Sequence, residues 1–183
     1  MHGQRWLMIV AALALVGGGC STREKKITAA DIAGTVVLET YRIDLGWNYS
    51  LAGMYIDGDG GVWSYELRGT PWYPDRLKGG EISERDLLTK HKNAQRIGTV
   101  DLQKLVEMAR LIPAAAKGRI TRAHPELEGN GARDVAYMLD KSNPIYKEIV
   151  LSGAGDLTAT NSSGESRALV DYLREVEQAV GYR

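Results

Sequence analysis

Residues 35–67 read TVVLETYRIDLGWNYSLAGMYIDGDGGVWSYEL, and this stretch decides the fold class. It is rich in β-branched and aromatic residues, and apolar side chains alternate with polar ones as in half-buried strands. The Asp-Gly-Asp-Gly-Gly run at 57–61 is a strong signal for a hairpin turn. In the first segment the alternation would place these apolar side chains on one face: Val37, Tyr41, Ile43 and Leu45. The sequence therefore predicts a three-stranded antiparallel meander with strands at 35–45, 49–56 and 62–67.

More strands and helices are predicted in the C-terminal half. Apolar segments at 134–140 and 145–152 flank the turn residues Lys-Ser-Asn-Pro and predict another hairpin. Apolar residues at helical spacing predict a helix over 101–112, which the following proline would end. The capping-box pattern from Ser162 to Glu165 predicts the start of a final helix. The apolar stripe of that helix would be Leu169, Tyr172, Leu173, Val176 and Val180.

The order of these segments indicates the fold class. Residues 82–95 are ambiguous and are assigned a short helix, whereas 69–80 and 117–133 are expected to be connections that contain glycine and proline. Strands and helices that come in separate blocks are typical of α+β folds with an antiparallel sheet. We therefore expect one α+β domain at 35–183 in the order βββ-α-ββ-α. Its antiparallel sheet of about five strands would be covered on one face by two or three helices.

The first 19 residues are not expected to belong to this fold. His2 and Arg5 form a short n-region, and an apolar run, Trp6–Val16, precedes Gly-Gly-Gly-Cys at 17–20. This three-part pattern is typical of a bacterial export signal. Because a transmembrane helix needs about 20 apolar residues, the run is too short to span a membrane. Residues 1–19 are therefore predicted to be a cleaved signal peptide.

The residues around the single cysteine resemble the lipobox of bacterial lipoproteins. In that family the cysteine thiol receives a diacylglycerol, and the new N-terminus is acylated after cleavage. The resemblance implies that Cys20 is lipidated, that residues 20–34 form a tether, and that the acyl chains hold the protein at a lipid bilayer. Ser21, rather than Asp, implies sorting to the outer membrane, on its periplasmic side. The pattern departs from the family at 17–18, where two glycines replace the usual Leu and Ala or Ser.

Ordinary signal-peptide cleavage is the alternative for this segment. Gly17 and Gly19 satisfy its small-x-small rule, and such cleavage would release a soluble periplasmic protein. The position of the only cysteine favours the lipoprotein interpretation, because an unpaired thiol is a liability in an oxidising compartment.

The composition excludes several classes of function. Lys and Arg number 23, as do Asp and Glu, so the chain has no net charge and no electrostatic footprint for nucleic acid. One Cys and three His leave little material for a disulfide framework or a zinc site, and no cofactor is predicted. A domain of about 150 residues can bury enough surface to fold alone, so a monomer is expected.

The turn carboxylates Asp57 and Asp59 are weak candidates for a metal site. Close carboxylates in a glycine-rich turn supply the oxygen ligands that Ca²⁺ prefers. However, an EF-hand needs Gly at its sixth position and Glu at its twelfth, where this chain has Val62 and Arg68. A solvated hairpin turn is therefore the favoured interpretation.

Aromatic residues suggest a binding surface. Trp72 and Tyr73 lie in the proline-containing loop and form the pair expected to be exposed to a ligand, either a glycan or a peptide. Core packing is the competing explanation for the other rings, since the chain has no Phe and must fill its core with Tyr and Trp.

No short catalytic motif occurs in the sequence. We therefore expect a non-catalytic binding or interaction module of the cell envelope, with a protein or a glycan as its partner. The alternative is a small envelope hydrolase that uses His124 with Glu126 or Glu128, or an acid pair at Asp57 and Asp59.

Overall fold

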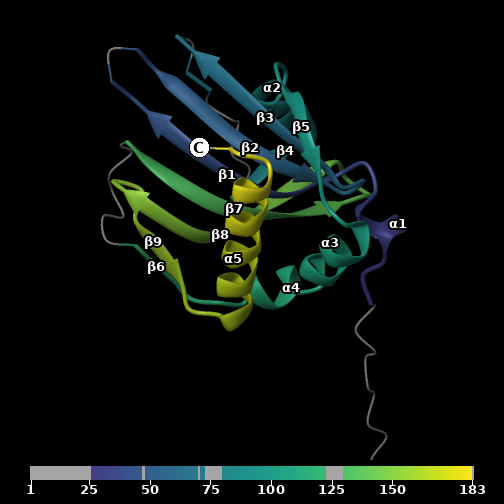
Figure 1. Ribbon diagram of the computed structural model, residues 1–183. Helices are drawn as coiled ribbons and strands as arrows, with labels where there is room; N and C mark the ends of the chain where they lie inside the picture. The colour runs from purple at the N-terminus through teal and green to yellow at the C-terminus, as the bar shows by residue number, and fades with distance from the viewer. Residues whose placement is uncertain (1–25, 47, 70, 73–79, 123–129, 183) are drawn as a thin grey trace, which may run out of the picture.

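The computed structural model describes residues 26–46, 48–69, 71–72, 80–122 and 130–182 (Figure 1). The strands are β1 (Val36–Asp44), β2 (Ser50–Asp57), β3 (Gly61–Arg68), β4 (Glu81–Ser83), β5 (Gln95–Thr99), β6 (Ile120–Arg122), β7 (Gly131–Asp140), β8 (Ile145–Gly155) and β9 (Ala159–Asn161). The helices are α1 (Ala29–Ile32), α2 (Glu84–Lys90), α3 (Leu102–Ala109), α4 (Ile112–Ala115) and α5 (Gly164–Ala179).

Within these residues, nine strands form one antiparallel sheet in the order β5-β3-β2-β1-β7-β8-β9-β6, and β4 pairs with β8 off this path. The prediction of an α+β domain in the order βββ-α-ββ-α, with a sheet of about five strands covered by two or three helices, is therefore wrong, because the fold is mostly sheet and has four further short strands. The five long strands β1, β2, β3, β7 and β8 match the predicted segments. The additional strands β4, β5, β6 and β9 have only three to five residues each, too few to show an alternating pattern. They form because neighbouring strands offer them hydrogen-bonding edges.

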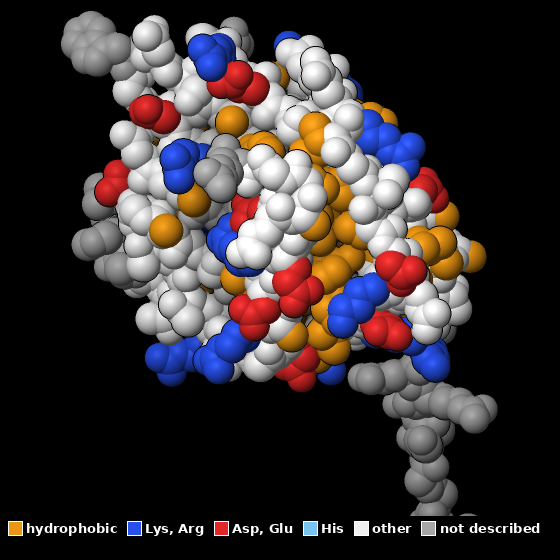
Figure 2. Space-filling view, viewed as in Figure 1, with side chains coloured by type: hydrophobic (Ala, Val, Ile, Leu, Met, Phe, Trp, Pro, Cys, Tyr) orange, Lys and Arg blue, Asp and Glu red, His pale blue; other side chains and the backbone are white. Residues whose placement is uncertain are grey.

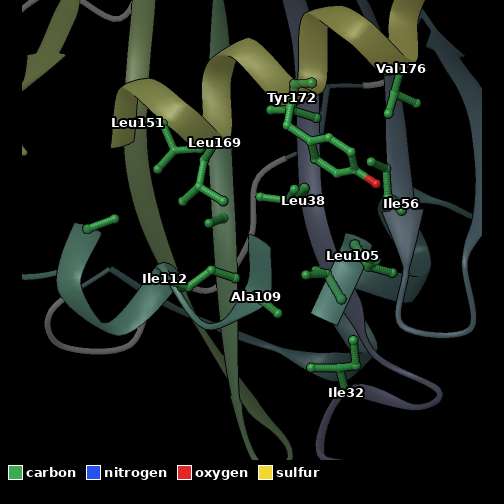
Figure 3. Packing of buried hydrophobic residues seen from close by; sticks show 14 of the residues in the cluster. Ile32, Leu38, Ile56, Leu105, Ala109, Ile112, Leu151, Leu169, Tyr172 and Val176 are labelled. Atoms are coloured by element: carbon green, nitrogen blue, oxygen red, sulfur yellow. The ribbon is translucent and has the colours of Figure 1, made fainter. Parts of the chain in front are cut away.

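One face of the sheet carries α3, α4 and α5, with α5 crossing in front of the strands (Figure 1). Tyr172 points from α5 toward the sheet, where it meets Leu38 and Ile56, while Leu105 approaches from α3 (Figure 3). Leu169, Tyr172, Leu173 and Val176 are all buried, which confirms the predicted stripe at these positions. On the outside of this face, apolar side chains gather in a strip beside the helix, flanked by charges of both signs (Figure 2).

The opposite face is also covered, contrary to the prediction of a sheet buried on one side only. Here α2 and β4 pack over a second core, whose buried tyrosines are Tyr41, Tyr49, Tyr65, Tyr137 and Tyr146. Because both faces are buried, Leu38, Glu39 and Thr40 are consecutive buried residues of β1. Because the register shifts between Val36 and Leu38, Val37 lies in the core under α3, α4 and α5, which we call the first core. Tyr41 lies in the second core, under α2. The two were predicted to share a face.

Two helix boundaries differ from the predicted ones. α3 ends at Ala109, and Pro113 lies in the first turn of α4, where a proline is tolerated because that position needs no helical N–H partner. α5 is capped by Ser163, one residue later than predicted, and the Ser163 hydroxyl accepts from the Ser166 amide. Within the ambiguous stretch 82–95 the predicted short helix is present as α2, and the edge strand β5 begins at the last residue of the stretch, Gln95.

The segment expected to be a tether joins the fold before residue 35. α1 lies within it, and Ile32 is buried in the first core. Residues 1–19, which are predicted to be a signal peptide, and Cys20 lie outside the described residues. Within the described part of the chain, no helix has the length and apolar character needed to cross a membrane.

Candidate binding groove and the buried charges behind it

A carboxylate lies at the centre of the second core. Glu39, on β1, is 0% exposed and faces α2. The phenol hydroxyls of Tyr65 and Tyr137 donate hydrogen bonds to it, and the Lys90 ammonium lies 2.9 Å from Oε1 and 3.0 Å from Oε2. Nε2 of His91 lies 3.2 Å from Oε1. We call these five residues the buried charge cluster.

A glycine makes this cluster possible. Tyr41 of β1, Gly53 of β2 and Tyr65 of β3 form one cross-strand row, so the Tyr65 phenol must pass over β2 to reach β1. A Cβ at Gly53 would lie 2.5 Å from the Tyr65 hydroxyl oxygen and 2.7 Å from the carbonyl oxygen of Thr40. The bare backbone therefore leaves the space that the phenol occupies.

Lys90 is buried among rings as well as against Glu39. It is the last residue of α2, and its side chain is 0% exposed. Its ammonium lies 3.9 Å from the ring centroid of Tyr41, 4.8 Å from that of Trp72 and 5.8 Å from that of Tyr65. A desolvated ammonium is attracted to the negative faces of such rings. The rings and the carboxylate together compensate its lost hydration.

The cluster keeps the Glu39 carboxylate charged. Burial alone would raise the pKa of Glu39, but the charges of Lys90 and His91 and the hydrogen bonds outweigh burial and lower that pKa strongly. Burial, and then the nearby Glu39 charge, raise the pKa values of Tyr65 and Tyr137 well above the ordinary 10.0. The phenols therefore stay protonated and act as donors to the carboxylate.

An open groove of about 330 Å³ lies beside this cluster, between the β1–β3 side of the sheet and α2. Its lining includes the rings of Tyr55, Trp63, His91 and Tyr146. Tyr55 stacks on His91 with centroids 4.1 Å apart and lies nearly parallel to Trp63, with centroids 6.3 Å apart. Glu39, Tyr55 and Trp63 are neighbours in one cross-strand row, so the rings stand directly beside the buried carboxylate.

The groove also has a negative field. Asp57, Asp59 and Glu84 line it, together with Lys92. Burial raises the pKa of Tyr55 to about 12, and Asp57 adds to that shift. Burial likewise raises the pKa of Tyr146, with Glu84 adding to the shift and the hydrogen bond from Val36 opposing it.

The carboxylates of both turn aspartates accept hydrogen bonds from the protein itself. Asp57 Oδ1 accepts from the amides of Asp59 at 3.0 Å and Gly61 at 2.7 Å, and its Oδ2 accepts from the Trp63 indole at 2.6 Å. Asp59 accepts from the Gly34 amide at 3.2 Å. Among the described residues, no group of three or more His, Cys, Asp or Glu is placed to hold a metal ion. The structure therefore lends the calcium interpretation no support.

Trp72 lies apart from the groove. It is half-buried over Lys90, its indole donates to the Asp86 carbonyl at 3.1 Å, and its amide donates to the Tyr49 hydroxyl at 3.1 Å. Trp72 thus helps to enclose the buried charge cluster. The other predicted site residues, Cys20, Tyr73, His124, Glu126 and Glu128, lie outside the described residues.

A second hollow, of about 340 Å³, lies between α1, α4 and the end of β7. Its lining is mainly aliphatic, and its charged residues make local contacts. Asp31 accepts from Thr28, Asp140 from Ser142, and Lys141 donates to the Ala30 carbonyl. Of these two hollows, the groove beside α2 is the stronger candidate site, because aromatic rings and carboxylates converge on it.

Sequence reasoning missed the buried charge cluster. A signal was present, because Glu39 is the only charged residue in the run VVLETY and the alternation places it on the same face as the apolar residues Val37 and Tyr41. Lys90 and His91 gave no comparable signal, since they lie in a polar stretch after Leu88. Tyr55 and Trp63 lie opposite each other across the β2–β3 hairpin.

No protein-family profile, no curated protein and no solved structure matches this chain significantly.

Proposed function

We propose that this protein is an exported lipoprotein, held at the periplasmic side of the outer membrane by acyl chains on Cys20, whose domain binds an envelope ligand without catalysis. The observation that carries the binding role is the groove of Tyr55, Trp63, His91 and Tyr146. Ligand sites are concave, combine aromatic walls with a few polar groups, and are usually preformed. The groove meets each of these conditions.

The groove is rigid by construction. Tyr55, Trp63 and Tyr146 project from β2, β3 and β8, and His91 is fixed by Glu39 behind it. Rings held on strands lose little conformational freedom when a ligand stacks on them. This supports recognition of a flat or apolar group on the ligand.

The same geometry disfavours a hydrolytic role for these groups. Glu39 is enclosed by its four partners, and its lowered pKa makes it a poor proton acceptor. The carboxylate of Asp57 is held by three donors of its own hairpin. The His124 version of the hydrolase stays a separate prediction, and alanine at His124 with every activity intact would remove it.

The anchor places the groove close to the membrane. Gly34 lines the groove and follows Cys20 by 14 residues. Even a fully flexible chain of 14 residues would span only about 20 Å, and α1 takes up four of these residues in a helix. The ligand is therefore expected at the bilayer surface.

The anchor is tested by the mass of the N-terminal tryptic peptide of protein isolated from membranes, beside a Cys20→Ser variant. A peptide that starts at Cys20 and carries acyl chains supports the proposal. An unmodified peptide that starts at Cys20 overturns the anchor and indicates a soluble periplasmic protein.

The groove is tested by photo-cross-linking in cells. A photoreactive residue at Leu88, which is 65% exposed and lines the groove, is compared with the same residue at Leu102, which is 41% exposed on α3. The proposal expects a defined cross-linked species at Leu88 that is absent at Leu102 and is lost when Trp63→Ala is added. Equal cross-linking at both positions, or none at Leu88, would overturn the binding role of the groove.

A further inference from the structure

The groove lining carries an excess of negative charge. Asp57, Asp59 and Glu84 contribute three carboxylates, whereas Lys92 contributes one ammonium and His91 an imidazole that lies against Glu39. Asp57 is held by its turn, whereas Asp59 is exposed at the rim. Glu84 is half-buried in the first turn of α2, and no described residue donates to its carboxylate or forms an ion pair with it. A half-buried carboxylate in this position favours a cationic group on the ligand.

The protein itself shows how this environment holds an ammonium. Behind the groove, Lys90 rests on the rings of Tyr41 and Trp72 and against Glu39. The groove repeats this set of groups with the rings of Tyr55, Trp63 and Tyr146 and the carboxylates of Asp59 and Glu84. Its own cation, Lys92, is exposed rather than buried against the rings. The groove therefore has the groups that stabilise a desolvated ammonium and leaves the place of that ammonium open.

Aliphatic side chains complete the wall. Leu87 is 1% exposed and Leu88 is 65% exposed, and both line the groove from α2. They would contact an alkyl chain that leads to the ammonium. This combination matches a lysine side chain better than a free peptide N-terminus, which has no such stem.

We infer that the ligand presents a primary ammonium on an alkyl stem, as on a lysine side chain of a peptide, with the ammonium between Glu84 and the rings of Tyr55 and Tyr146. This inference rests on the proposed binding role of the groove. The attraction combines a cation–π contact with an ion pair at a half-buried carboxylate.

The test follows the indole N–H signal of Trp63 by NMR in the full chain carrying Cys20→Ser, which cannot be acylated. The first probe is Nα-acetyl-lysine amide, and the matched neutral probe is Nα,Nε-diacetyl-lysine amide. We expect a saturable shift with the first probe and binding weaker by at least about fivefold with the second. Glycylglycine amide, which has a terminal ammonium and no stem, should also bind more weakly than the first probe.

Two variants of the same type provide the control. Glu84→Gln should weaken binding of Nα-acetyl-lysine amide by about fivefold or more. Glu165→Gln, in the first turn of α5 on the other face, should leave it unchanged, although it also removes a carboxylate from the first turn of a helix. Unfolding curves of both variants separate lost binding from lost folding.

The outcomes separate this inference from the proposed function. If the neutral probe shifts the Trp63 signal as strongly as the charged one, the ammonium is not recognised, and the groove still binds. If glycylglycine amide binds as tightly as the lysine derivative, the stem is not recognised and the source is a peptide N-terminus. If no probe shifts the signal, the inference fails, while the Leu88 cross-link decides the proposed function independently.

Discussion

The two faces of the sheet are stabilised in different ways. Under α5 the core is largely aliphatic, and its ion pair, Arg174–Asp134, lies at the edge, where the arginine side chain is 47% exposed. Under α2 the core is built from tyrosines around Lys90–Glu39, and both of these side chains are 0% exposed. Leu38 and Glu39, adjacent on β1, belong to the two opposite environments.

This difference shows how one strand can serve stability on one side and a site on the other. Burial of aliphatic side chains is favourable without directional requirements. A buried ion pair is different, because its desolvation can exceed the attraction between the ions unless all partners are in place. The α2 face therefore gains a fixed arrangement of groups rather than added stability, and the groove lies beside that fixed arrangement.

Removing the Glu39 carboxylate should lower the free energy of unfolding more than any other change considered. Glu39→Ala leaves Lys90 buried without its counter-ion and should lower the free energy of unfolding by about 3–5 kcal/mol. Adding Lys90→Met should recover part of that loss, because it removes the unpaired charge. Urea unfolding followed by circular dichroism measures both changes.

The neighbouring residue gives the control for this prediction. Leu38→Ala should also cost about 2–5 kcal/mol, by opening a cavity in the aliphatic core. Lys90→Met should not rescue it, because Leu38 faces the other side of the sheet. Rescue of both variants, or of neither, would contradict the distinction between the two faces.

A smaller loss of unfolding free energy is expected from a substitution at Gly53, which tests whether the Tyr65 phenol needs the space above this residue. In Gly53→Ala the new methyl group would collide with the Tyr65 hydroxyl, so the free energy of unfolding should fall by about 1–3 kcal/mol. Gly164→Ala serves as the control, because a Cβ added there would meet nothing within 4 Å, and this variant should be neutral or slightly stabilising. Equal stability of both variants would show that the Tyr65 phenol does not need the space over Gly53.

Much of the fold could be predicted because long elements repeat their pattern many times. The alternation in β1 to β3 and the helical stripe of α5 each involve several apolar residues, and these elements were located correctly. The short strands β4 and β9 could not be predicted, because three residues carry no period and form only on an existing edge. The coverage of the second face was missed for a related reason, since the helix responsible, α2, has only seven residues.

The site was less predictable than the fold, because it depends on contacts between distant residues. Glu39 and Lys90 are 51 residues apart in the chain, and Glu39 and Tyr137 are 98 apart. Taken singly, Lys90 and His91 read as solvated polar side chains, and Tyr65 and Tyr137 read as core tyrosines. Only the sheet register, with Gly53 between Tyr41 and Tyr65, brings them together.

The smallest change in unfolding free energy is expected from alkaline pH. It tests whether the phenols of the α2 face stay protonated in the folded protein. Because burial and the Glu39 charge raise the folded pKa of Tyr65 and Tyr137 above 10.0, these phenols stay neutral in the folded protein while they ionise in the unfolded chain. Their contribution is present below pH 10 and is lost as the pH rises, by about 1 kcal/mol per phenol between pH 10 and 11. In Tyr65→Phe the fall of unfolding free energy over this range should be smaller by about that amount, measured as urea midpoints at each pH. If the unfolding free energy of Tyr65→Phe fell as steeply with pH as that of the unsubstituted protein, the Tyr65 phenol would ionise as readily in the folded protein as in the unfolded chain. It would then not belong to the buried charge cluster.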